Sequence, residues 1–169
     1  LTVLVDLVVA VNIGVILATL QFVRRMSGSV EVLQLSGEQL HQELGGNGPA
    51  VLPQGVLVYA IDGPFFFGAV ENFERALLAT HTVPEVLVLR LKRVPFMDIT
   101  GLQALEEVIQ KMQSRGVRVI LCEANARVMQ KLEATELTGL LGQDGYFDTI
   151  DAALDHCRHT DPAHSRRQS

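Results

Sequence analysis

The sequence predicts an α/β domain with a largely parallel or mixed sheet, covered by amphipathic helices and preceded by one transmembrane helix. Two patterns carry this prediction. Continuous apolar, β-branched runs alternate along the chain with segments whose apolar residues recur every three or four positions, and one longer apolar run opens the chain. Strands that are apolar throughout are typical of parallel sheets with helices on both faces. A chain of 169 residues has room for one such domain and a short appendage.

The opening run from Leu1 to Val23 has no polar face. As a helix rising ~1.5 Å per residue, it is long enough to cross a hydrocarbon core of ~30 Å. Arg24 and Arg25 follow directly, and positive charge beside a span marks its cytoplasmic side. We therefore expect residues 1–25 to form a helix in the inner (plasma) membrane, with the remainder of the chain in the cytoplasm.

Two other interpretations of the opening run are weaker. A signal peptide is disfavoured because no basic residue precedes the run and no small-residue cleavage site follows it. A buried core helix is disfavoured because helices that are apolar all round at this length are rare outside membranes. The chain begins with Leu, and we take it as the C-terminal piece of a longer protein.

Small and polar residues within the run have specific interpretations. Ala10, Gly14 and Ala18 recur every four residues and form a stripe against which another membrane helix could pack closely. Asp6 is either an intramembrane carboxylate or the N-cap of a helix that begins at Leu7, and we favour the cap.

The segment after the run has the composition of a linker, with a break at Gly45–Pro49. Within it, Ser29–Leu35 is a candidate strand, and Ser36 with Gln39 has the spacing of a capping box that opens a short helix. The predicted division of the chain is a transmembrane helix (1–25), a linker (26–53), the domain proper (54–158) and a polar tail (159–169).

Apolar patterning defines the elements of the domain. The first predicted strand of the domain runs from Gly55 to Ile61. The second covers Glu85–Leu91, and the third covers Val117–Cys122. One helix follows each strand, the first beginning at Ala69, the second with apolar residues between Leu102 and Met112, and the third carrying Val128, Met129 and Leu132. The last helix has apolar residues between Ile150 and Cys157, with Asp148 placed to cap it.

Several function classes are excluded or disfavoured by composition and motifs. The formal net charge of -5 argues against nucleic acid as a partner. Cys122 and Cys157 are too far apart for a redox or zinc pair, and His156, Cys157 and His159 are interpreted as the polar end of a helix. The strand ends lack a phosphate-binding glycine motif and a nucleophile elbow. We therefore expect no catalytic residue, no metal and no cofactor.

The loop from Val94 to Leu102 is the one strand end with distinctive chemistry. Thr100 precedes a helix and Gln103 lies three residues later, which predicts that Thr100 caps the helix. A hydroxyl at a helix N-terminus is also a favourable phosphate position, so Thr100 is a candidate phospho-acceptor. We expect this loop to be the partner-binding surface, formed by Asp98, Thr100, Gly101 and Leu102.

Two loop motifs carry a family resemblance. The turn Gly63-Pro64-Phe65-Phe66-Phe67-Gly68 and the segment Pro95-x-x-Asp98-x-Thr100-Gly101 occur in the order strand, turn, helix, strand, loop, helix, strand, helix. This arrangement resembles the STAS domain, a module shared by sulfate transporters and anti-sigma-factor antagonists. The turn is similar to the form found in SulP anion transporters, and residues 7–26 resemble the final transmembrane helix of that family.

The resemblance implies a regulatory or interaction domain of a secondary anion transporter of the sulfate, bicarbonate or dicarboxylate class. The implied partners are the remaining transmembrane helices, a cytoplasmic protein or a nucleotide, and a second copy through the full transporter. The alternative is a phospho-switch module like the anti-sigma-factor antagonists, in which the hydroxyl at the position of Thr100 is phosphorylated. That acceptor is a serine, and Thr suits its kinase less well.

Overall fold

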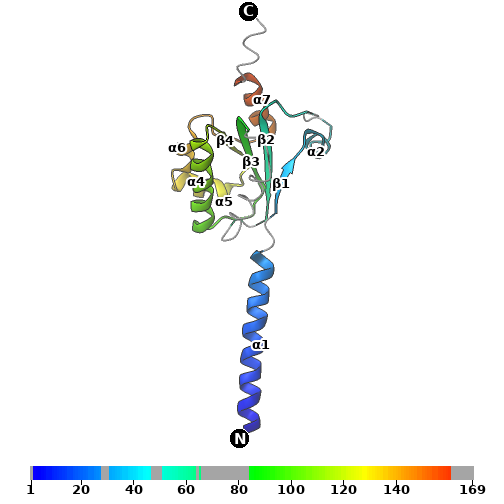
Figure 1. The fold of residues 1–169 in the computed structure, drawn as a ribbon, viewed down its shortest axis with the longest axis vertical. Coiled ribbons are helices and arrows are strands. Elements are labelled where there is room, and N and C mark those ends of the chain that lie inside the picture. The colour runs from blue at the N-terminus through cyan, green and yellow to red at the C-terminus, as the bar shows by residue number, and fades with distance from the viewer. Residues whose placement is uncertain (1, 28–30, 47–50, 64, 66–83, 161–169) are drawn as a thin grey trace, which may run out of the picture.

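The computed structural model describes residues 2–27, 31–46, 51–63, 65 and 84–160 (Figure 1). The predicted turn at 63–68 is described only at Gly63 and Phe65, and the predicted helix from Ala69 lies outside the described residues. The strands are β1 (Glu31–Leu35), β2 (Val56–Asp62), β3 (Val86–Arg93), β4 (Arg118–Cys122) and β5 (Tyr146–Phe147). The helices are α1 (Thr2–Ser27), α2 (Gly37–Glu43), α4 (Ile99–Ser114), α5 (Ala126–Ala134), α6 (Leu137–Leu141) and α7 (Ile150–Thr160).

The strands form one mixed sheet in the order β1-β2-β3-β4-β5. β1 runs antiparallel to β2, and the remaining pairs are parallel. The central strand β3 is buried from Leu87 to Leu91, as a strand covered on both faces must be. The α/β class with a largely parallel sheet is confirmed.

Alternate side chains of each strand enter two separate cores. On one face Leu87, Leu89 and Leu91 of β3 pack with α4, α5 and α6. On the other face Val58 and Val88 pack with α2 and α7. Figure 1 shows α4, α5 and α6 gathered on one side of the sheet. The two layers of helices therefore leave the ends of the strands as the places where loops can carry function.

The sheet begins earlier in the chain than the sequence indicated. β1 pairs with β2 from Glu31↔Asp62 to Leu35↔Val58, and Leu40 of α2 is fully buried. The predicted capping box is present: Ser36 Oγ accepts from the Gln39 backbone N–H, and Gln39 Oε1 accepts from the Ser36 N–H. Residues 31–43, which the sequence placed in a linker, are therefore part of the domain.

α1 extends away from the sheet as a continuous helix (Figure 1). Asp6 lies inside it, so the prediction that Asp6 caps a helix beginning at Leu7 is wrong. Residues 7–22 are all exposed, including Ala10, Gly14 and Ala18, which share one helical face. Within the described residues, no helix meets the length and hydropathy that a membrane span requires.

The C-terminal third departs from the prediction in four places. Thr149, not Asp148, caps α7, because its Oγ1 accepts from the Ala152 backbone N–H at 3.2 Å. The short helix α6 and the strand β5, which adds a parallel edge to β4, were not predicted. α7 itself extends to Thr160, beyond the predicted start of the tail at 159.

Candidate functional site

The loop between β3 and α4 is held in place by hydrogen bonds to its main chain from three residues outside the loop. Phe65 pairs with this loop, donating its N–H to Phe96 O at 3.1 Å and accepting from the Asp98 N–H at 3.4 Å. Asn125 Nδ2 donates to Val94 O at 2.6 Å, and Lys131 Nζ donates to Met97 O at 2.5 Å. The loop therefore presents its exposed groups from a fixed backbone.

Asp98 caps α4, and the prediction that Thr100 is the cap is wrong. The backbone of Asp98 is extended, and its Oδ1 accepts from the Gly101 N–H at 2.8 Å. Thr100 is the second residue of the helix, and its hydroxyl donates to Asp98 Oδ1 at 2.9 Å. The hydroxyl thus lies beside the helix N-terminus and is held there by the capping carboxylate.

The four residues predicted to contact a partner separate into two pairs. Thr100 is exposed and Asp98 is half-buried, so both present side-chain atoms to solvent. Gly101 and Leu102 are buried and support the loop from inside the domain. Two large apolar side chains, Phe96 and Ile99, lie exposed in the same segment, and Ile99 is 61% exposed.

A second cluster, which sequence reasoning missed, surrounds Arg90 in the middle of β3. The Arg90 side chain is only 2% exposed, and it pairs with Glu123 through Nε and with Glu43 through Nη1 at 2.7 Å. Glu123 follows β4 with a left-handed backbone, φ 57°, which an ordinary residue rarely adopts. An arginine inside the otherwise apolar run Val86–Leu91 was the one sequence feature that could have revealed this cluster.

The charges in this cluster shift the pKa of Glu43. Burial alone would raise that pKa, but the hydrogen bond from Arg90 and the positive charges of Arg90, Arg93 and Lys92 outweigh it. The pKa of Glu43 therefore lies below its usual value of 4.5, and the carboxylate is ionised at neutral pH.

On the same face of the sheet, burial raises the pKa of Cys122 to about 12, so this thiol stays protonated.

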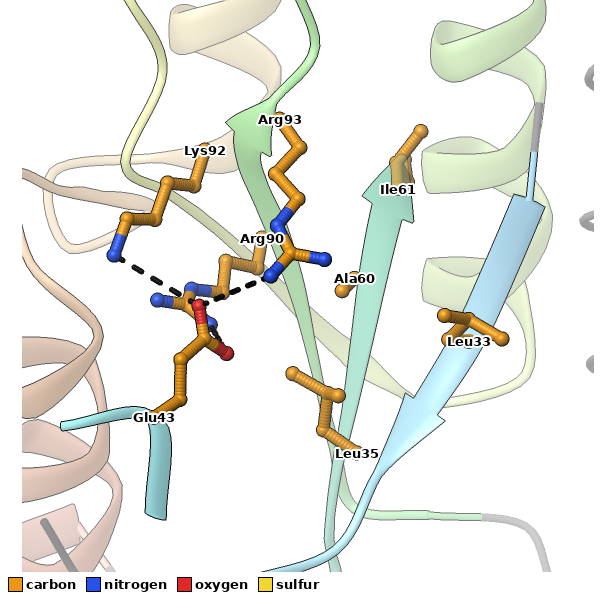
Figure 2. A pocket seen from close by; sticks show the side chains of 8 residues that line it. All are labelled: Leu33, Leu35, Glu43, Ala60, Ile61, Arg90, Lys92 and Arg93. Atoms are coloured by element: carbon orange, nitrogen blue, oxygen red, sulfur yellow. Dashed lines mark hydrogen bonds and ion pairs between the residues drawn. The ribbon is translucent and has the colours of Figure 1, made fainter. Parts of the chain in front are cut away.

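Beside Arg90 and Glu43 lies a small pocket between β1, β2 and β3 (Figure 2). Its volume of about 30 Å³ has room for water or a very small ion. A nucleotide does not fit into this pocket. Within the described ranges, no group of three or more His, Cys, Asp or Glu side chains is arranged to hold a metal ion.

Comparison with known proteins gives consistent results. The sequence model of the STAS domain family matches residues 49–153. A solved SulP transporter STAS domain from Vibrio cholerae is 43% identical, with a TM-score of 0.62 over 73% of this chain and 97% of that one.

Two curated transporters are also similar over most of the chain. The putative sulfate transporter YvdB of Bacillus subtilis is 29% identical over 89% of this chain and 27% of its own length. The bicarbonate transporter BicA of Synechocystis is 30% identical over 91% of this chain and 28% of its own length. The chain thus spans little more than a quarter of these two relatives.

Proposed function

The chain belongs to the STAS domain family in the form found in SulP transporters, and from this premise we propose that it is the cytoplasmic regulatory domain of a secondary anion transporter. The names of the similar transporters support sulfate or bicarbonate as the transported class, and the family resemblance adds dicarboxylates. The proposed partners are the remaining transmembrane helices, a second copy of the transporter and a cytoplasmic protein at the loop between β3 and α4.

No described helix meets the criterion for a membrane span. We propose from its exposed apolar surface that α1 is nevertheless the final membrane helix of that transporter. Its apolar side chains from residue 7 to 22 are exposed on every face, and Arg24 and Arg25 lie near its end. The two hydrophobic cores contain no residue of α1 among those described, so we expect the domain to fold without this helix. Exposed apolar surface of this extent is expected to be covered by lipid or by other helices.

Deletion of residues 1–27 is expected to release the protein from membranes. The full chain should sediment with the membrane fraction and require detergent, whereas the shortened chain should stay in the supernatant, because most of its described large apolar side chains are buried in the two cores. Fractionation of cells expressing each form measures this. Equal distribution of both forms would contradict the membrane placement of α1.

The signalling surface is proposed to centre on Thr100 and Asp98, and the observation that carries it is the exposed Thr100 hydroxyl on a fixed backbone. A phosphate on this hydroxyl would lie at the N-terminus of α4, where the helix dipole favours negative charge. Phe96 and Ile99 would add apolar contacts for a protein partner beside it. Thr100 therefore remains our candidate phospho-acceptor, now as a neighbour of the cap rather than the cap itself.

Substitutions at this surface should separate stability from regulation. Asp98→Ala removes the cap and should lower the free energy of unfolding by about 1 kcal/mol, whereas Thr100→Ala should cost less than about 0.5 kcal/mol. Thr100→Asp adds charge that the helix dipole favours and Asp98 repels, so stability should change little while transport changes. Thermal unfolding of the chain and anion uptake by the full transporter are the two measurements.

Gln103→Glu serves as the matched control, because it adds negative charge to an exposed position of the same helix. Uptake by this variant should equal that of the unmodified transporter. If uptake follows the melting temperature across all four variants, Thr100 has a structural role alone. The alternative function, a phospho-switch module without transport, is disfavoured because such a protein has no use for the exposed apolar surface of α1.

A further inference from the structure

Three cationic side chains of β3 surround a single carboxylate at the end of α2. Figure 2 shows Glu43 between Arg90, Lys92 and Arg93. Arg90 Nη1 donates to Glu43 Oε2 at 2.7 Å, while Lys92 Nζ and Arg93 Nη2 lie 3.8 Å and 3.7 Å from Glu43 Oε1. The last two distances exceed that of a hydrogen bond. The carboxylate therefore makes a hydrogen bond with Arg90 alone, and Lys92 and Arg93 interact with it only by charge. Arg93 has a second acidic partner, because its Nη1 donates to Asp62 Oδ2 at 3.0 Å.

The guanidinium of Arg90 has a donor that the described residues do not use. Its Nε edge is taken by Glu123 and its Nη1 by Glu43, but Nη2 is buried without a hydrogen-bond acceptor among the described residues. A buried donor without a partner is destabilising, because it has lost its hydrogen bonds to water and gained none in return. Nη1 and Nη2 together form a planar fork that fits two oxygens of one anion, and Glu43 occupies only half of it.

The surroundings favour a compact anion over a larger ligand. Leu35 and Ala60 form an apolar wall of the pocket, which strengthens charge interactions inside it. The volume of about 30 Å³ is small, so additional room has to come from the space that the Glu43 carboxylate fills. Glu43 is the last residue of the seven-residue helix α2, a position at which a side chain can leave its partners without disturbing the sheet.

We propose that this pocket binds a small oxyanion of the sulfate or bicarbonate class in place of the Glu43 carboxylate. Two oxygens of the anion accept from Nη1 and Nη2 of Arg90, and a further oxygen accepts from Lys92 or Arg93. The Glu43 carboxylate then competes with the anion for the same donors. It occupies the site until the anion concentration is high enough to displace it. This inference goes beyond the proposed function and does not rest on the loop at Thr100.

Calorimetric titration of the 169-residue chain in detergent micelles tests the proposal. Sodium sulfate and sodium bicarbonate are the probes, with sodium chloride used to hold the ionic strength constant. Saturable binding is expected. Glu43→Gln removes the competing charge at nearly the same size and should tighten binding about tenfold, the equivalent of one charge-assisted hydrogen bond. The double variant Lys92→Gln/Arg93→Gln should weaken it about tenfold for the same reason.

Arg115→Gln is the matched control, because it removes one exposed positive charge after α4 and away from the pocket. Its affinity should equal that of the unmodified chain. The substituted cations are half exposed, and thermal unfolding of each variant verifies that it is folded. The proposal is overturned if Glu43→Gln binds no more tightly than the original chain, or if binding is not saturable. Equal weakening by Arg115→Gln would show a general effect of charge and would overturn it too.

Discussion

Gly101→Ala is expected to lower the free energy of unfolding by about 3 kcal/mol, at the upper end of the usual cost of overpacking. A Cβ at this position would lie 2.3 Å from Phe65 O and 3.1 Å from Met97 Cγ. The carbonyl cannot move away easily, because Phe65 O also accepts from the Asp98 N–H that fixes the loop. Urea-induced unfolding, followed by circular dichroism, measures the loss.

Gly139→Ala is the control for Gly101→Ala. Gly139 also lies in a helix, but a Cβ there would have no atom within 4 Å. Alanine is the better helix former by roughly 1 kcal/mol, so this variant should be as stable as the original chain or slightly more stable. Equal stability of the two variants would show that the loop yields and that the contact with Phe65 does not constrain Gly101.

The contact with Phe65 also explains which part of the loop could be predicted from the sequence. Asp98 and Thr100 are both good N-cap residues, and local spacing favoured Thr100 because Gln103 completes a capping box with it. The structure starts the helix one residue after Asp98, where Gly101 can approach the Phe65 carbonyl. The capping box at Ser36 was predicted correctly, because its two partners are local and no distant segment competes for them.

The strands could be predicted because continuous apolar runs indicate buried strands. The charged cluster around Arg90 could not be predicted. Arg90 finds Glu43 and Glu123 at separations of 47 and 33 residues, and no local pattern specifies such pairs. The strand β5 (Tyr146–Phe147) could not be predicted either, since a strand of 2 residues has no periodicity to detect. Tertiary pairing, and not propensity, determines these parts of the fold.

Arg90→Leu is expected to lower the free energy of unfolding at about pH 7 by about 3 kcal/mol or more. The substitution leaves Glu123, whose side chain is 14% exposed, and Glu43 without the cation that neutralises them. Removal of one partner of a buried pair costs more than the pair contributes, because the remaining charges stay partly desolvated. Arg93→Gln is the comparison: its side chain is 57% exposed, and its loss should cost less than about 1 kcal/mol.

The dependence on pH distinguishes charge pairing from packing as the cause of the Arg90→Leu loss. The pKa of Glu43 is lowered in the folded chain, so its contribution is present above the usual value of 4.5 and is lost as the pH falls through the lower, folded value. In the original chain, acid therefore removes the pairing with Glu43. In the variant, acid neutralises the carboxylate that had lost its partner. The two stabilities should converge as the pH falls below 4.5 and through the lowered pKa of Glu43, as measured by urea unfolding across the pH range. A difference that stays constant down to acid pH would show that the Arg90 side chain contributes mainly by filling space in β3.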